Sequence, residues 1–204
     1  MGLISDGTTI FDAGALDSGI AKGAMTFIKK LTASSSGSLT FLNGASSVVL
    51  DSTFKEYFFT FKNIHPQTNG AALSINFTSD GTNYNVTKTT TYFLTRQNEA
   101  NNGNEISYKT SLDLAQSGSN QALDVDSSSD NDHAESGFLH LYDPASTTFA
   151  KHFTATVNNV QTGNAAMTHY TGGYLNTTSA VTGVRFVMSA GNMDLGDICL
   201  YGIA

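Results

Sequence analysis

The C-terminal stretch Thr182–Ile203 most narrowly limits how this chain can fold. In its first half, Val184–Ser189, apolar side chains occupy every second position, which is the period of a half-buried β-strand. A second apolar segment, Asp197–Gly202, follows a glycine-rich turn. A hydrophobic strand in this place is expected to be paired inside a sheet, because an unpaired strand would be an aggregation-prone edge. Both segments therefore predict β-strands that belong to a sheet.

Segments of strand length continue through most of the chain, separated by turn residues. The clearest is Glu56–Ile64, in which alternate aromatic residues share one face. These are Tyr57, Phe59 and Phe61, which we expect to be buried in a central strand. The pair His65–Pro66 should mark the end of the strand, because proline cannot continue a central strand. The other predicted strands are Ala24–Leu31, Ser38–Leu42, Ser47–Leu50, Ala72–Thr78, Tyr84–Thr95, Ser136–Tyr142, Phe149–Asn158 and Ala165–Leu175.

This pattern predicts an all-β fold, an antiparallel β-sandwich that resembles a jelly roll. The Asp80–Gly81 pair before Tyr84–Thr95 is typical of a β-hairpin. The segment Glu105–Gln116 could be a short helix or an irregular strand. A parallel α/β fold is excluded because no crossover helices are predicted. The glycine-spaced segment Met1–Gly23 is expected to be an extended N-terminal arm, and residues 24–204 a single β-sandwich domain.

The chain has few charged residues and a negative net charge, and both limit the partners that it can bind. Charged residues make up 13% of the chain and the net charge is −7, whereas typical soluble domains have roughly 25% charged residues. We expect no nucleic-acid binding, because phosphate contacts need clustered Lys and Arg and the one local basic pair is Lys29–Lys30. A single cysteine, Cys199, excludes an internal disulfide, and its apolar neighbours predict a buried, unreactive thiol.

The N-terminal segment predicts the compartment in which the chain folds. Met1–Ile20 has neither the basic start nor the apolar run of a secretory signal. No stretch approaches the roughly 20 apolar residues of a membrane-spanning helix. We therefore expect folding in a reducing cytoplasm and no membrane partner.

Two sets of residues could hold a metal ion. The acidic segment Asp124–Asp132 offers carboxylates that suit Ca²⁺, but it lacks the glycine and glutamate of a helix–loop–helix calcium loop. We favour a solvent-exposed loop that needs no metal. His140 and His152 could form a zinc pair if their strands are neighbours, although zinc sites normally have three or four protein ligands. We expect the histidines to be hydrogen-bonded within the sheet instead. The carboxylates concerned are Asp124, Asp126, Asp130 and Asp132, and the histidines are His65, His133, His140, His152 and His169.

The sequence gives no support to an enzyme. It contains neither a Gly-x-Ser-x-Gly motif nor a phosphate-binding glycine loop that leads into a helix. Paired carboxylates for glycoside hydrolysis would meet only in the fold, yet the acidic residues concentrate in predicted loops. Aromatic residues could line a sugar-binding platform, although the chain has no tryptophan and aromatic residues at strand spacing are more often core. These are Tyr92, Phe93, Tyr108, Tyr170 and Tyr174. We expect no catalytic residue, no cofactor and no metal site.

Four stretches of the chain resemble virion structural proteins of tailed bacteriophages, especially marine ones. They are STFKEYFFTFKNIHP (Ser52–Pro66), FTSDGTNYNVT (Phe77–Thr87), SGFLHLYDPASTTFAKHF (Ser136–Phe153) and GGYLNTTSAVTGVRFVMSAGNMDLGDICLYGI (Gly172–Ile203). The likeness covers most of Ser52–Ala204 and consists of strand-and-turn patterns without active-site residues. It implies a β-rich particle component, and members resemble tail-fibre, capsid-surface or other structural proteins of the virion.

The resemblance predicts a non-enzymatic virion protein, assembled in the host cytoplasm, that decorates the capsid or forms a head or tail appendage. Its expected partners are other virion proteins, including the major capsid protein, and further copies of itself, with a trimer favoured. The alternative is a receptor-binding tail-fibre module that binds host carbohydrate. No heptad, collagen-like or β-helix repeat is present to build a fibre shaft.

The arm Met1–Gly23 is expected to dock on a neighbouring subunit. It carries apolar side chains that would be unfavourable in water. An extended segment could cover them by adding a strand to a partner's sheet edge. The alternative is that the arm folds back as an edge strand of its own sandwich. The apolar residues are Leu3, Ile4, Ile10, Phe11, Leu16 and Ile20.

Overall fold

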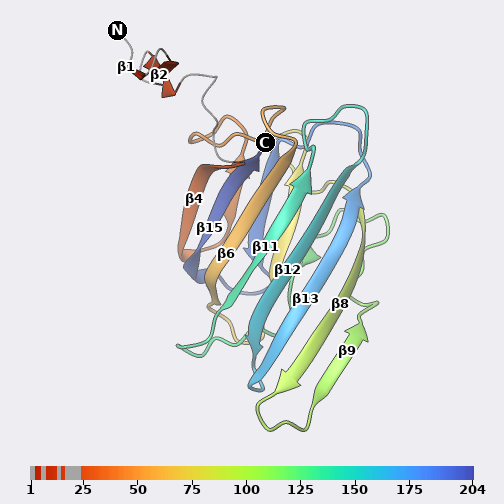
Figure 1. Cartoon of the computed structure of the whole chain (residues 1–204). Coiled ribbons are helices and arrows are strands. Elements are labelled where there is room, and N and C mark those ends of the chain that lie inside the picture. Colours follow the sequence, from red (N-terminus) through yellow and green to blue (C-terminus); the bar gives the residue numbers. More distant parts are fainter. Residues whose placement is uncertain (1–2, 6–7, 13–14, 17–23) are drawn as a thin grey trace.

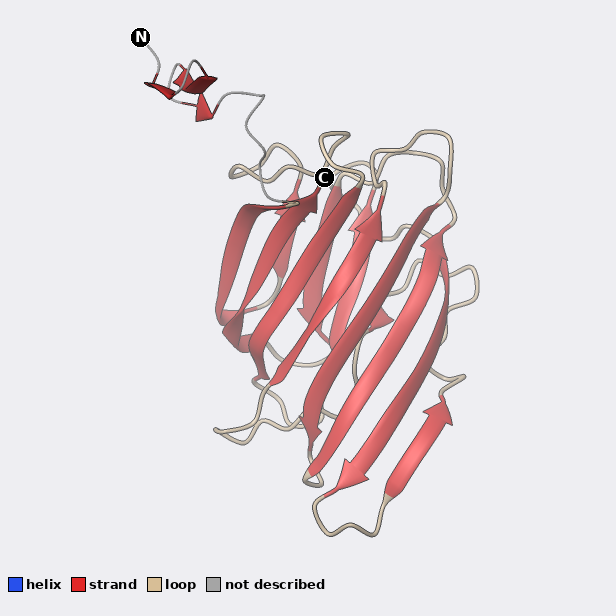
Figure 2. Ribbon diagram, viewed as in Figure 1, coloured by secondary structure: helices blue, strands red, loops and turns tan. Residues whose placement is uncertain are grey.

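The computed structural model describes residues 3–5, 8–12, 15–16 and 24–204, and the secondary structure of these residues consists of strands and no helix (Figures 1 and 2). Two antiparallel sheets pack face to face, with the smaller sheet behind the larger one in Figure 1. The predicted all-β sandwich is therefore confirmed. As in a jelly roll, strands from distant parts of the chain lie side by side.

The large sheet has eight strands and the small sheet has four. The order in the large sheet is β4 (Met25–Ser36), β15 (Met193–Ile203), β6 (Glu56–Pro66), β11 (Glu135–Tyr142), β12 (Lys151–Gln161), β13 (Ala165–Leu175), β8 (Lys88–Asn98) and β9 (Asn104–Tyr108). The order in the small sheet is β10 (Gln121–Ala122), β7 (Leu73–Thr78), β14 (Gly183–Met188) and β5 (Leu39–Leu42).

The C-terminal strand lies inside the large sheet, as predicted. β15 is paired on one side with β4 and on the other with β6, so both edges of this hydrophobic strand are covered. β14, the other strand of the C-terminal stretch, is paired with β7 and β5 in the small sheet. The glycine-rich turn between β14 and β15 thus carries the chain from one sheet to the other.

Aromatic side chains between the sheets form the centre of the core. On β6, Tyr57, Phe59 and Phe61 all face inward and are buried, which confirms the prediction for this strand. Phe59 packs edge-on against Phe41 of β5 and Phe186 of β14, at ring-centroid distances of 5.3 and 5.5 Å. These contacts join β6 of the large sheet to β5 and β14 of the small sheet.

Two local predictions are wrong, and one that left two alternatives open is decided. Ser47–Leu50 is a loop, in which Ser47 has a positive φ of 65°, as does the preceding Ser46 with 49°, outside the β region. The Asp80–Gly81 turn exists but does not form a hairpin, since the strands on its two sides, β7 and β8, belong to different sheets. The segment Glu105–Gln116 contains most of the short strand β9 followed by a loop, and no helix.

The N-terminal region contains three short strands, β1 (Leu3–Ser5), β2 (Thr8–Asp12) and β3 (Ala15–Leu16). They form a separate antiparallel sheet and pair only with one another, so the described strands of the arm are not edge strands of the sandwich. Residues 17–23, including Ile20, lie outside the described residues. Docking of the arm on a neighbouring subunit stays a prediction.

Candidate interaction surface

The side of the large sheet that faces away from the small sheet, hereafter the outer face, carries three cross-strand rows of side chains. Neighbours within each row are register partners on adjacent strands. The first row is Glu56, Tyr142, His152, Tyr174 and Thr89; the second is Phe27, Tyr201, Phe58, His140, Thr154, Gly172 and Thr91; the third is Lys30, Cys199, Thr60, Phe138, Thr156, Tyr170, Phe93 and Tyr108.

Aromatic rings on the outer face contact one another and remain partly open to solvent. Phe93 stacks on Tyr170 with ring centroids 4.6 Å apart and an interplanar angle of 11°. At the opposite end of the face, Phe27 packs edge-on against Tyr201 at 5.6 Å. Phe27 is 57% exposed and Phe93 is 41% exposed. The rings are thus held in place by neighbours while their outward surfaces stay accessible.

Four of the five aromatic residues predicted as a sugar-binding platform lie on the outer face. They are Phe93, Tyr108, Tyr170 and Tyr174. The fifth, Tyr92, points into the molecule and is fully buried, so its assignment to the platform is wrong. Adjacent residues of a strand point to opposite faces, and Tyr92 and Phe93 are such a pair.

Alternation along β15 also explains why the prediction of a buried Cys199 is wrong. Ile198 and Leu200 face inward and are fully buried, so Cys199 between them faces outward. Its exposure is intermediate. The low reactivity expected of the thiol stays a prediction that a thiol-labelling experiment on the folded protein can test.

A shallow groove of about 340 Å³ opens on the outer face around Gly172. We call it the Gly172 groove. Gly172 lies between Thr91 and Thr154 across the strands, and between Tyr170 and Tyr174 along its own strand. Because glycine has no side chain, the backbone forms the floor of the groove. The residues that line it are Thr89–Thr91, His152–Thr154 and Gly172–Tyr174.

Hydrogen bonds hold Tyr174 beside this groove. Its hydroxyl accepts a hydrogen bond from the Nε2 amide of Gln116 at 3.1 Å, and the same amide donates to Thr89 at 2.8 Å. Asn176 in turn donates to Oε1 of Gln116 at 2.7 Å. The ring of Tyr174 is therefore positioned before any ligand arrives, which reduces the entropic cost of binding.

The acidic segment Asp124–Asp132 differs from the prediction of a solvent-exposed loop. Asp130 and Asp132 are exposed, but Asp124 is fully buried, as are the neighbouring side chains of Ser127 and Ser128. Asp124 accepts hydrogen bonds from the backbone amide of Leu73 and the hydroxyl of Ser127. The loop turns inward at Asp124, where the bond from Leu73 ties it to strand β7 of the small sheet.

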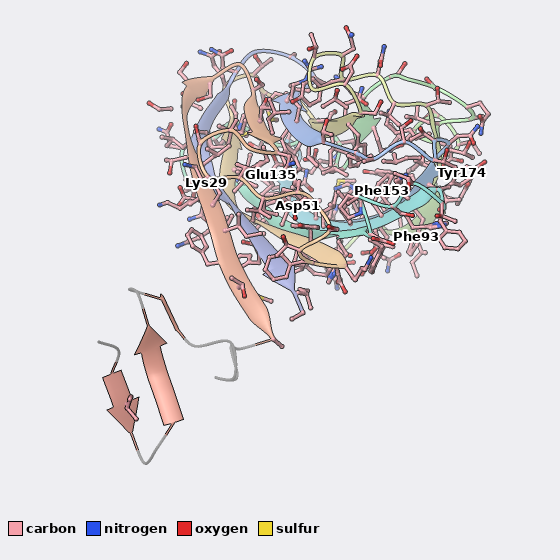
Figure 3. All side chains as sticks on the ribbon, turned by 90° about the horizontal axis from the view of Figure 1, so that it is seen from above. Lys29, Asp51, Phe93, Glu135, Phe153 and Tyr174 are labelled. Atoms are coloured by element: carbon pink, nitrogen blue, oxygen red, sulfur yellow. The ribbon has the colours of Figure 1, made fainter. Side chains whose placement is uncertain are left out.

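Asp124 belongs to a buried polar network between the two sheets. The Ser127 hydroxyl lies 3.0 Å from Oε2 of Glu135, and Asn159 donates to Ser127 at 2.7 Å. Asn159 also accepts from Nε2 of His169 at 3.0 Å, and Nδ1 of His169 lies 2.7 Å from the Tyr92 hydroxyl. Figure 3 shows Glu135 and Phe153 between the sheets and Phe93 on the other side of the large sheet.

Burial controls protonation in this network. It raises the pKa of Glu135 well above its ordinary value, and the adjacent Asp124 carboxyl raises it further. It also raises the pKa of Asp124, although hydrogen bonds from Glu135 and Ser127 oppose the rise. The pair therefore retains a proton at a pH where exposed carboxyls have lost theirs, since two buried like charges so close together are strongly unfavourable.

The other histidines do not gather at one site. The strands of His140 and His152 are neighbours, but His140 is the register partner of Thr154, and its Nδ1 contacts a carboxylate oxygen of Glu56. His65 and His133 line a second groove of about 540 Å³ beside the loop that follows the acidic segment. Within the described part of the chain, no three His, Cys, Asp or Glu side chains gather closely enough to hold a metal ion.

The buried His169 makes a testable prediction for acid stability. Burial lowers its pKa from 6.5 to about 4. Because the unfolded chain binds a proton between these values and the folded protein does not, stability should fall as the pH drops from 6.5 to 4. The loss should reach about 3 kcal/mol. Urea unfolding of the native protein and of His169→Gln between pH 7 and 4 checks this, and equal acid losses in both proteins would contradict it.

Comparisons with protein-family models, curated proteins and solved structures found no match to this chain. Among the residues whose structure is described, no helix has the length and apolar character needed to cross a membrane.

Proposed function

We propose that this protein is a non-enzymatic structural component of a bacteriophage virion, either a capsid decoration protein or a head or tail appendage. The observation that carries the proposal is the outer face of the large sheet, where exposed apolar side chains are arranged in rows across its strands. Exposed members include Phe27, Phe93, Tyr108, Phe138 and Tyr142. Soluble monomers rarely expose contiguous apolar patches above a few hundred Å², and larger ones mark interaction sites.

The sequence resemblance to phage virion proteins supplies the class of partner. A decoration protein must adhere to other virion proteins or to copies of itself over a broad, flat surface, and the outer face supplies such a surface. We propose a homo-oligomer, with a trimer favoured, in contact with the major capsid protein or an appendage protein.

The test is the copy number of the protein on purified particles. Mass spectrometry of particles should find this chain in a fixed ratio to the major capsid protein, near stoichiometric if it is a decoration protein. Phe138→Asp, which places a charge in the middle of the outer face, should reduce its recovery with particles at least about tenfold. Phe149→Asp is the control, because Phe149 is 70% exposed and lies in a loop. Absence of the chain from purified particles would overturn the proposal.

A second candidate function is a receptor-binding module that attaches the particle to host carbohydrate. The Gly172 groove favours it, because this groove places the positioned ring of Tyr174 beside hydroxyl groups. A receptor binder would be present in few copies per particle, whereas a decoration protein would be present in many.

A further inference from the structure

We propose that the Gly172 groove binds a neutral pyranose ring of a glycan. The proposal deepens the second candidate function, although binding itself can be measured without reference to the particle. Three features support it: the Tyr174 ring in the lining of the groove with Tyr170 two residues away along the strand from Gly172, hydroxyls that lack strong partners, and a lining without Asp, Glu, Lys or Arg.

The rings flank a place where the sheet has no side chain. Tyr170 and Tyr174 lie two residues before and two residues after Gly172, and all three are on the outer face. Stacking on Phe93 fixes the ring of Tyr170, and the hydrogen bond from Gln116 fixes Tyr174. The C–H face of a sugar packs on such preorganised aromatic surfaces without loss of side-chain freedom.

The hydroxyls at the floor are available to a ligand. Thr91 is exposed, and its side-chain contact is a long one of 3.4 Å to the carbonyl of Gly172. Thr154 is exposed as well, and its hydroxyl lies 3.4 Å from that of Tyr142. A hydroxyl both donates and accepts hydrogen bonds, so two of them on opposite sides of Gly172 match the hydroxyl groups around a sugar ring.

The charge of the surroundings selects the ligand class. None of the described residues that line the groove is Asp, Glu, Lys or Arg. The nearest lysines in sequence, Lys88 and Lys151, face inward and are almost fully buried. A phosphate, sulfate or carboxylate would therefore lose its hydration without gaining a charged partner. A neutral, hydroxyl-rich ligand has no such penalty.

Glycine at position 172 is not required by the packing of the sheet. A Cβ atom added there would meet Thr154 Cγ2 at 3.8 Å and the Phe153 carbonyl at 3.9 Å, which are ordinary contacts. At the neighbouring Gly173, by contrast, an added Cβ would lie 2.6 Å from the Thr89 carbonyl oxygen. The space above Gly172 can thus be filled without disturbing the fold, and it stays open in this chain.

The experiment uses the full-length protein on an array of neutral and acidic oligosaccharides, with solution titration of each positive glycan. We expect saturable binding to neutral glycans and none to sialylated or sulfated ones that lack the same neutral residue. Gly172→Val, which fills the groove, and Tyr174→Ala, which removes one ring, should each weaken binding at least about tenfold. Phe27→Ala, on the far edge strand of the same face, should leave affinity unchanged.

Each result decides the proposal. The thermal unfolding of every variant is measured, so that a variant that loses binding because it is unfolded is recognised. If Tyr174→Ala is unstable, Gly172→Val serves as the test. The proposal is overturned by an array without saturable neutral ligands, by unchanged affinity in Gly172→Val, or by an equal loss in Phe27→Ala. Failure here would leave the copy number on particles, and hence the structural role, unaffected.

Discussion

Phe59→Ala is expected to lower the free energy of unfolding by about 3–5 kcal/mol. The Phe59 side chain is completely buried on β6 and packs between Phe41 and Phe186 of the small sheet. Its removal leaves a cavity where the two sheets meet, and the neighbouring rings belong to paired strands that cannot easily close it. Urea unfolding at neutral pH measures the change.

The matched control is Phe149→Ala, the same substitution at a side chain that is 70% exposed in a loop. Its effect should stay within about 0.5 kcal/mol. A loss below 1 kcal/mol for Phe59→Ala, comparable to the control, would mean that the contact between the sheets is not the main core of the protein.

Strand positions could be predicted from the sequence because alternation is a local property. Glu56–Ile64 and Ala165–Leu175 match observed strands closely. In the first, the inward residues Tyr57, Phe59 and Phe61 are aromatic and buried. The partners of a strand are not local, so the Asp80–Gly81 pair predicts a turn correctly but not the hairpin. Its local geometry is that of a tight turn, with Gly81 at φ +80°, whichever sheet the next strand joins.

The outer face could be predicted in part and the buried network could not. Aromatic residues of the platform were identifiable by type, but the facing of Tyr92 and Cys199 depends on the exact alternation of β8 and β15. The burial of Asp124 has no local signal, because its neighbours in sequence are polar and acidic. What buries it is the amide of Leu73 and the side chain of Asn159, both distant in the chain. Glu135, the first residue of β11, lies just before the predicted strand Ser136–Tyr142, so its burial had no local signal either.

The buried carboxyl pair gives the second large expected effect, a loss of stability as the pH rises. The ordinary pKa of a glutamate is 4.5, and that of Glu135 in the folded protein lies well above it. Above pH 4.5 the unfolded chain releases this proton while the folded protein keeps it. Stability therefore falls with rising pH, at up to about 1.4 kcal/mol per pH unit for one retained proton.

Glu135→Gln should remove this pH dependence while it preserves the network. The single proton of the Ser127 hydroxyl goes to Asp124. A glutamine amide at position 135 can donate a hydrogen bond into the network in place of the protonated acid. The variant should thus match the native protein near pH 5 and exceed it in stability at pH 8.

His169 acts below pH 6.5 in both proteins, so its contribution cancels in the difference between them. Urea unfolding at each pH unit from 5 to 8 measures that difference, with the exposed Glu99→Gln as control. If the free energies of unfolding of the native protein and Glu135→Gln change in parallel with pH, the buried pair ionises as freely as a surface carboxyl. The inward turn of the acidic segment would then not be held by a shared proton.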